Sequence, residues 1–274
     1  MRKYQVAVVQ MDTQNNKQEN LDQMAAYVKE SAQKGAKLVV FPEVSNILSE
    51  DPIHAESIPG PTTELMMKLA KENKIWIHTG SLSEKNPDGD RTYNTSVLIS
   101  PEGEIVATYQ KIHNFDMDLP DGSSVRESDR KEPGSNVVTV STELGHLGFA
   151  ICYDMRFPEL FRLMTLEGAE VIFVPANFTM ATGKDHWEPL LRSRAIENGC
   201  YIIAPDQVGK KEKYQAYGNS LVIDPWGTVI ARASDKPCVI LAEIDLDYLE
   251  DVRRRNPSVS NRRKDVYQLK KFQY

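Results

Sequence analysis

The sequence predicts an α/β fold in which helices cover β-sheet, and three observations support this prediction. Apolar runs of strand length alternate along the chain with longer segments of helical periodicity. Two distant segments have similar sequences, and each is typical of a β-hairpin with a Pro-x-Gly turn. The chain has 274 residues, of which 41% are hydrophobic, which is enough to bury a full core. We therefore expect one domain over residues 1–274, with the segment from about 245 to 274 as a candidate subunit contact.

The first part of the chain predicts a strand, a helix and a second strand. Residues 4–9 form a short apolar run that is typical of a buried strand. The helix that follows ends near Gly35 and has one apolar face, formed by Leu21, Met24, Ala25, Val28 and Ala32. Residues 37–41 then predict a second buried strand, which ends at Pro42.

The alternation of helices and strands continues through the rest of the sequence. We expect helices at 63–72, 158–166 and 187–198. We expect strands at 75–80, 147–151 and 171–174.

The two similar segments suggest that the chain consists of two related halves. Residues 95–107 and 219–231 share their apolar pattern and their Pro-x-Gly turn, and residues 39–42 are loosely repeated at 171–175. Two related halves would form two sheets stacked face to face, with helices outside. The alternative is that Pro-Gly hairpins are common and that the likeness is accidental.

Charge and hydropathy exclude several classes of function. The chain has 33 Lys and Arg against 39 Asp and Glu, so the net charge of −6 gives no reason to expect nucleic acid as a partner. Short basic runs at 253–255 and 262–264 are interpreted as solvated or packing side chains, or as a subunit contact. No segment approaches the ~20 apolar residues of a membrane helix, and the N-terminus becomes polar too early for a signal peptide. We expect a cytoplasmic protein that does not bind membranes.

The cysteines and histidines argue against a disulfide framework and against a metal site. The three cysteines are widely spaced without a C-x-x-C pair, and the five histidines form no H-x-x-x-H motif. No phosphate-binding or dinucleotide-binding glycine motif is present. We therefore expect neither a metal nor a cofactor.

Cys152 is the candidate nucleophile because it follows the apolar run 147–151 and precedes Pro158, which is well placed near a helix start. A thiol at such a strand-to-helix turn is expected to have a lowered pKa, beside backbone N–H groups that can hold an oxyanion. The alternative is a buried apolar cysteine. That alternative is the interpretation we apply to Cys200 and Cys238.

A thiol that attacks an amide needs a base, and the sequence offers several candidates. His113 and His186 both lie in expected loops, whereas Glu43 directly follows the strand at 37–41 and would serve if burial raised its pKa. Lys111 follows the first hairpin. Glu43 and Lys111 could equally be solvated groups at strand ends. The long irregular stretch 113–136 is expected near the mouth of the site.

Three ordered blocks resemble the signatures of the nitrilase superfamily of carbon–nitrogen hydrolases. They are Phe41-Pro42-Glu43, Tyr109-Gln110-Lys111-Ile112-His113 and residues 150–159 around Cys152. The resemblance covers nearly the whole chain. It implies an αββα sandwich and a triad of Glu43, Lys111 and Cys152 that needs no cofactor.

The resemblance also implies a mechanism. Glu43 takes the thiol proton, Cys152 attacks the carbonyl, and Lys111 with the backbone N–H of Tyr153 stabilises the oxyanion. Ammonia leaves, and Glu43 then activates the water that hydrolyses the thioester. A second carboxylate, Glu127, helps to position the substrate and the lysine.

Segments 113–120, 126–128 and 178–188 are similar to one branch of that superfamily, the branch that acts on deaminated glutathione. The resemblance implies supporting roles for Tyr153, Arg156, Phe178, Thr182, His186 and Trp187. Arg126, Arg130, Arg156 and Lys184 would suit an anionic amide substrate. The sequence departs from the vertebrate pattern of the branch at residues 129–131.

Two alternatives to that activity stay open at this point. One is an ω-amidase that acts on α-ketoglutaramate or α-ketosuccinamate. The other, from a different class, is a binding or redox-sensing module that uses the Cys152 thiol. Members of the superfamily commonly pair, so the resemblance further implies a homodimer or a higher homo-oligomer.

Overall fold

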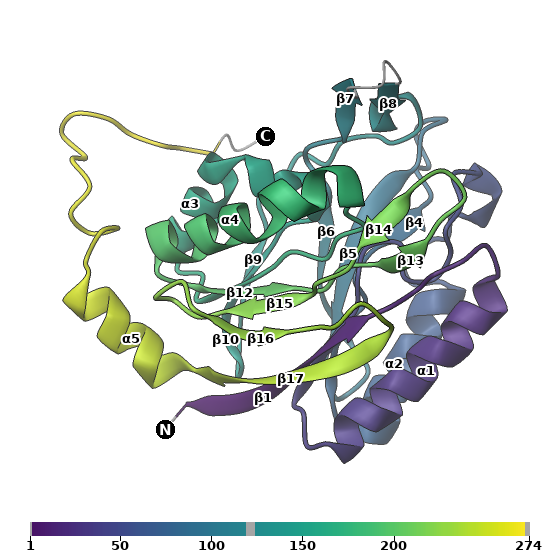
Figure 1. Ribbon diagram of the computed structural model, residues 1–274, viewed down its shortest axis with the longest axis horizontal. Helices are drawn as coiled ribbons and strands as arrows, with labels where there is room; N and C mark the ends of the chain where they lie inside the picture. The colour runs from purple at the N-terminus through teal and green to yellow at the C-terminus, as the bar shows by residue number, and fades with distance from the viewer. Residues whose placement is uncertain (1, 119–123, 272–274) are drawn as a thin grey trace.

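The computed structural model describes residues 2–118 and 124–271, and it has the four layers of an αββα sandwich (Figure 1). The first sheet has seven strands in the order β17-β1-β2-β3-β5-β4, with β6 also paired to β5. The strands are β1 (Lys3–Gln10), β2 (Leu38–Val40), β3 (Trp76–His78), β4 (Leu82–Glu84), β5 (Tyr93–Ile99), β6 (Ile105–Gln110) and β17 (Cys238–Asp245).

The second sheet has six strands in the order β16-β15-β12-β11-β10-β9. They are β9 (Thr139–Thr142), β10 (Gly145–Phe149), β11 (Val171–Phe173), β12 (Tyr201–Ala204), β15 (Leu221–Ile223) and β16 (Val229–Arg232). Two small hairpins complete the strands: β7 (Asp116–Asp118) with β8 (Ser124–Arg126), and β13 (Val208–Lys210) with β14 (Gln215–Tyr217).

The helices form the outer layers of the sandwich. The first sheet is covered by α1 (Lys17–Gln33) and α2 (Pro61–Asn73), and the second by α3 (Pro158–Leu166) and α4 (Met180–Asn198) (Figure 1). The chain also forms α5 (Leu246–Arg255) and the 3-10 helices η1 (Pro52–His54), η2 (Glu127–Asp129) and η3 (Cys152–Arg156). Within the described ranges, no helix is both long enough and apolar enough to cross a bilayer.

Alternation along β1 connects the layers. Val6 and Val8 are fully buried in the cluster that contains Phe149 of the second sheet. Ala7 and Val9, which point to the opposite face, are buried with Met24 of α1. Both faces of β1 are therefore buried from Val6 onward, which explains the continuous apolar run in the sequence.

The two sheets repeat the same order of strand pairing. The strands β1, β2 and β3 run parallel and are followed by antiparallel β5 and β6, while β10, β11 and β12 are followed by antiparallel β15 and β16. Both hairpins shift register at equivalent steps, between Leu98 and Ile99 and between Val222 and Ile223. This match supports the interpretation of two related halves.

The predicted elements are present, with ends that differ by a few residues, except at the start of α4. This helix begins at Met180 and not at residue 187, and it contains Pro189. Residues 180–186 lack the apolar periodicity of a helix, and Gly183 lowers helix propensity. Packing decides the conformation here, because Gly183 lies directly against the ring of Tyr217.

Further regions differ from the prediction, and α5 and the strands β4, β9, β13 and β14 were not predicted. The stretch 113–136 contains the hairpin of β7 and β8 and the short helix η2, while residues 119–123 lie outside the described part. The strand β17 was not predicted, although it pairs with β1 over its full length, from Lys3 with Asp245 to Gln10 with Cys238. It is only partly buried over most of its length, so its apolar signal is diluted.

Candidate active site

The junction of the two halves brings together the three residues of the proposed triad. Glu43 follows β2 of the first half, whereas Cys152 follows β10 of the second. Both contact the segment after β11: Glu43 N donates to Ala176 O at 3.3 Å, and Cys152 N donates to Pro175 O at 2.9 Å. Lys111 lies at the end of β6, and its side chain is only 2% exposed.

Cys152 begins the short helix η3 with φ +47°, a left-handed conformation that L-residues other than glycine seldom adopt. The turn is held by Asp154, whose N donates to Ile151 O at 3.0 Å and whose Oδ2 accepts from Ile151 N at 2.8 Å. Among the residues that the structure describes, the backbone N–H of Tyr153 has no acceptor. The N–H beside the thiol is therefore free to bind an oxygen atom.

Asp154 is a fully buried carboxylate that sequence reasoning missed. Besides Ile151, it accepts hydrogen bonds from Tyr109 Oη at 2.7 Å and from His113 N at 3.1 Å. His113 Nδ1 lies 2.7 Å from Asp154 Oδ1, and its ring stacks on Phe157. His113, a candidate base in the sequence, thus contacts a carboxylate that orders the turn of Cys152. The sequence signal that could have found it is an acidic residue, Asp154, next to the apolar run that ends at Cys152.

Glu43 is 5% exposed and has a partner on each carboxylate oxygen. Oε1 accepts from Lys111 Nζ at 3.1 Å and from Asn94 Nδ2 at 2.9 Å, and Oε2 accepts from Asn177 N at 2.9 Å. Its carbonyl oxygen accepts from Gln207 Nε2 at 2.9 Å. Glu43 is therefore not the solvated strand-end carboxylate of the alternative interpretation.

Glu127 lies on the other side of Lys111. Its Oε2 accepts from Lys111 Nζ at 2.8 Å and from Phe115 N at 2.6 Å, and its Oε1 lies 3.4 Å from Asn94 Nδ2. Asn94 thus touches both carboxylates, a role that an asparagine within a strand did not reveal in the sequence. Lys111 is held between Glu43 and Glu127 and is not solvated.

Burial and the neighbouring charges set the protonation of these groups. Burial, and then the negative charge of Glu43, raise the pKa of the Cys152 thiol well above its ordinary value, while Lys111 acts in the opposite direction. The expected lowering by a helix N-terminus is therefore wrong, because desolvation outweighs the effect of one short helix. The resting thiol is protonated and needs a base.

The same effects determine the charges of Lys111 and Glu127. Burial lowers the pKa of Lys111, but the charges of Glu127 and Glu43 outweigh it and hold the pKa well above its ordinary value. Burial raises the pKa of Glu127, but Lys111 outweighs it and holds the pKa below its ordinary value. Lys111 is therefore an ammonium and Glu127 a carboxylate at neutral pH.

Arg156, at the end of η3, contacts three of the supporting residues. Its guanidinium lies 5.5 Å from the ring centre of Tyr153, 5.6 Å from that of Phe178 and 3.4 Å from His186 Nδ1. Within the described ranges it forms no ion pair. It is therefore a cation available to an anionic ligand.

The remaining candidates are more dispersed. Thr182 Oγ1 lies 3.3 Å from Thr179 Oγ1 at the start of α4, whereas Trp187 is fully buried, packs on Phe178 and donates to Asn219 O at 2.9 Å. Lys184 is exposed on α4. The other two candidate cations pair with surface carboxylates, Arg126 with Asp118 and Arg130 with Glu50.

The other cysteines lie away from this cluster. Cys200 is fully buried, and burial raises its pKa to about 12, as expected for a packing residue. Cys238 is partly exposed at the start of β17. In residues 2–118 and 124–271, no group of three or more His, Cys, Asp or Glu side chains could hold a metal ion.

Comparison with known proteins gives consistent matches. The carbon-nitrogen hydrolase family matches residues 5–254. The deaminated glutathione amidase of Homo sapiens is 42% identical over 271 residues, or 96% of this chain and 83% of that protein. The omega-amidase NIT2 of Danio rerio is 38% identical over 280 residues, which cover 100% of this chain and 99% of that protein. The crystal structure of the C. elegans NitFhit protein superposes with a TM-score of 0.91 at 35% identity, over 97% of this chain and 66% of that one.

Proposed function

This chain belongs to the carbon–nitrogen hydrolase family and is an amidase, and we propose that it cleaves a small anionic amide through a thioester on Cys152. The contacts among Glu43, Lys111 and Glu127, next to a protonated thiol, are the single observation that carries this proposal. They supply a base, an oxyanion-stabilising cation and a nucleophile within one buried cluster.

The first half of the reaction forms the thioester. Glu43 accepts the proton of Cys152 Sγ, and the thiolate forms a bond with the carbonyl carbon of the amide. The carbonyl electrons move to its oxygen, which is stabilised by Lys111 Nζ and the free N–H of Tyr153. When the oxyanion collapses, the C–N bond breaks and Glu43 returns the proton to the leaving nitrogen.

The second half hydrolyses the thioester. Glu43 takes a proton from water, whose oxygen attacks the acyl carbon. The second oxyanion uses the same two donors, and its collapse breaks the C–S bond. The thiolate recovers its proton from Glu43, and a carboxylic acid is released. Glu127 keeps Lys111 charged and in place during both the formation and the hydrolysis of the thioester.

Arg156 supports an anionic acyl group as the substrate. Its guanidinium lies by the Tyr153 and Phe178 rings and would pair with a substrate carboxylate, and His186 of α4 lies beside it. The identity with deaminated glutathione amidases supports deaminated glutathione as this substrate. That compound has no primary amide, so a peptide amine leaves from it in place of ammonia.

An ω-amidase is the second candidate, supported by the 38% identity with the omega-amidase of Danio rerio. Both candidate substrates present a keto acid to Arg156 and differ in the leaving group. A redox-sensing role would need a thiol with a low pKa, and the raised pKa of Cys152 counts against it.

The proposal is tested with Cys152→Ala and with Cys200→Ala as the matched control. Formation of the carboxylic acid is followed with deaminated glutathione and with α-ketoglutaramate. We expect Cys152→Ala to lose turnover and Cys200→Ala to keep it, with an acyl adduct on Cys152 seen by mass spectrometry of quenched wild type. Turnover by Cys152→Ala would refute the mechanism, and the ratio of kcat/KM values decides between the two substrates.

We also propose that the protein is a cytoplasmic homodimer or higher homo-oligomer, with the segment from about 245 to 274 at the contact. Val266 and Tyr267 support this, because these large apolar side chains are 67% and 54% exposed. Light scattering that finds a monomer would contradict it.

A further inference from the structure

The cluster around the thiol has more buried negative charge than positive charge. Glu43 and Glu127 are carboxylates that share one ammonium, that of Lys111, and Asn94 offers them only neutral hydrogen bonds. The charges of this group sum to minus one while the thiol is protonated. In a desolvated site, such an excess opposes the formation of a thiolate and of an oxyanion. Arg156 does not offset this excess, because the substrate carboxylate would neutralise it in the proposed function.

A second lysine, Lys131, lies on the turn that carries Glu127. Its backbone N donates to Glu127 O at 2.8 Å, so it ends the turn that begins with that glutamate. Its Nζ donates to Ser83 Oγ at 2.6 Å and to Thr92 Oγ1 at 2.8 Å. In the part of the chain that the structure describes, it forms no ion pair with a carboxylate. Neutral hydroxyls thus hold a partly buried cation whose charge is not compensated locally.

The position of Thr92 places this ammonium on the side of the reacting groups. Thr92 and Asn94 are two residues apart in the extended chain that leads into β5, so their side chains point to the same face, about 7 Å apart. Asn94 contacts both carboxylates of the cluster. Two unit charges about 7 to 12 Å apart, at an effective dielectric constant of about 20, change each other's equilibria roughly 10- to 50-fold.

We propose that Lys131 is a positioning residue for the amide hydrolysis. Its ammonium fastens the turn of Glu127 to β4 and to the start of β5, and it balances the excess negative charge of the cluster. This inference rests on the proposed function of Cys152 and Glu43.

The charged groups around Lys131 determine the pH dependence that follows. Burial lowers its pKa to about 8; Glu127 and Glu43 act to raise it, and Lys111 and Arg130 add to the lowering. The protonated form is the one that assists the reaction. The contribution of Lys131 is therefore present at neutral pH and is lost as the pH rises through about 8.

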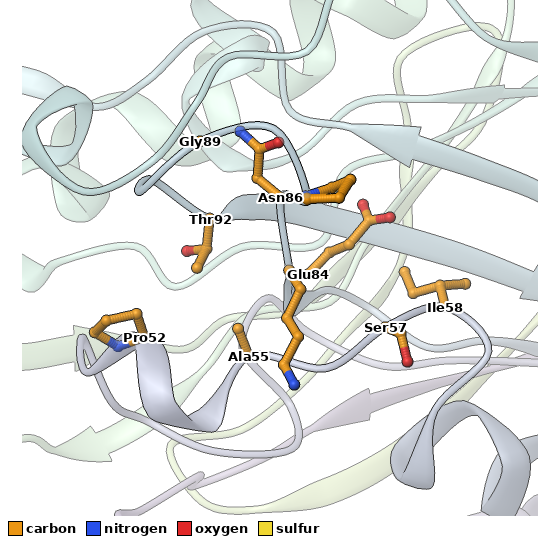
Figure 2. A pocket seen from close by; sticks show the side chains of 10 residues that line it. Pro52, Ala55, Ser57, Ile58, Glu84, Asn86, Gly89 and Thr92 are labelled. Carbon is orange, nitrogen blue, oxygen red and sulfur yellow. The ribbon is translucent and has the colours of Figure 1, made fainter.

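A cavity lies beside one of the hydroxyl partners of Lys131. The space has a volume of about 570 Å³ and is lined by Thr92, a hydroxyl partner of Lys131, and by none of Glu43, Lys111 and Cys152. Figure 2 shows Thr92 facing this space, across from Pro52 and Ala55. Lys131 is itself partly exposed, so protons can exchange there without entering the reacting cluster.

The test compares kcat/KM against pH for Lys131→Met, Lys131→Arg and a control, Lys85→Met. Lys85 lines the same cavity and is exposed. We expect wild type and Lys85→Met to lose activity above pH about 8. The kcat/KM of Lys131→Met should be roughly 10- to 50-fold lower than that of wild type at pH 7 and should not decline above pH about 8. Lys131→Arg keeps its charge at high pH, so its decline should move upward by more than one pH unit.

A substrate-independent readout separates this inference from the proposed function. The rate at which iodoacetamide alkylates Cys152 should fall in Lys131→Met and stay unchanged in Lys85→Met, whether or not any amide is hydrolysed. If wild type cleaves no amide but alkylation follows this pattern, the proposed function fails and the role of Lys131 stands. Equal alkylation rates, or a decline near pH 8 that persists in Lys131→Arg, would overturn the inference.

Discussion

At the scale of single residues, the site depends on groups whose charge is set by burial. Cys152 and Lys111 are both buried, and the thiol is held protonated while the amine is held charged. Burial and then the negative charge of Glu43 raise the pKa of the thiol, whereas the charges of Glu127 and Glu43 outweigh burial and raise the pKa of Lys111. A base next to a protonated thiol is the arrangement that general-base activation requires.

The buried carboxylate of Asp154 yields a prediction at this scale. In Asp154→Asn, the amide nitrogen must face at least one of the donors that now point at a carboxylate oxygen, from Ile151, Tyr109 and His113. We expect the free energy of unfolding to fall by about 2–3 kcal/mol, because hydrogen bonds to a buried charged group are among the stronger ones.

Urea denaturation measures this effect, with Asp185→Asn, at an exposed position of α4, as the control. We also expect kcat to fall by a larger factor than KM rises, because the turn that presents Cys152 is displaced. Unchanged stability in Asp154→Asn would mean that the turn is held by other contacts.

At the scale of elements, tertiary packing overrides local preference in α4. The helix starts seven residues before its apolar periodicity begins, includes Gly183 and Pro189, and lacks a side-chain cap. The close contact with β14 explains the glycine, because a Cβ atom at residue 183 would lie 2.3 Å from Tyr217 Cγ. This first turn of α4 carries Thr182 and leads to His186.

The prediction at this scale is that Gly183→Ala destabilises the protein. Helix propensity alone would favour alanine by about 1 kcal/mol. The overlap with Tyr217 outweighs this, and we expect a net loss of about 1–3 kcal/mol. Thermal unfolding measures it, and Lys184→Ala, at an exposed position of the same helix, serves as a control for propensity alone. A Gly183→Ala variant more stable than wild type would show that the ring of Tyr217 moves away at little cost.

At the scale of the whole molecule, the site exists only where the two halves meet. The first half supplies Glu43 and Lys111 and the second supplies Cys152, and the segment at 175–177 is hydrogen-bonded to both Glu43 and Cys152. The central core is also shared, since side chains of both sheets belong to one buried cluster. Neither half can therefore keep the cluster in place by itself.

We accordingly predict that the halves unfold together. In a urea titration, loss of amidase activity, exposure of Cys152 to alkylation and loss of helical circular dichroism should have one common midpoint. Cys152 is the useful probe because it is buried at the junction. A separate early transition in any of the three signals would contradict the expectation of one domain over residues 1–274.

The sequence by itself determined the fold class, most helices and strands, and the candidates Glu43, Lys111, Glu127 and Cys152. Periodicity reports burial directly, and the three blocks are local in the chain, so both can be read from neighbouring residues. Among other places, it failed at β17, which is mostly only partly buried, and at the start of α4, where the fold imposes a helix on a weak local pattern.

Only the tertiary structure decided which polar residues hold the candidate site together. Asn94 and Asn177 contact Glu43 across 51 and 134 positions of sequence, and Lys131 reaches Ser83 across 48. Likewise, the pKa of Cys152 is raised by burial and by a charge from the other half of the chain. These effects depend on distances in space between residues far apart in the sequence, so they cannot be predicted from neighbouring residues.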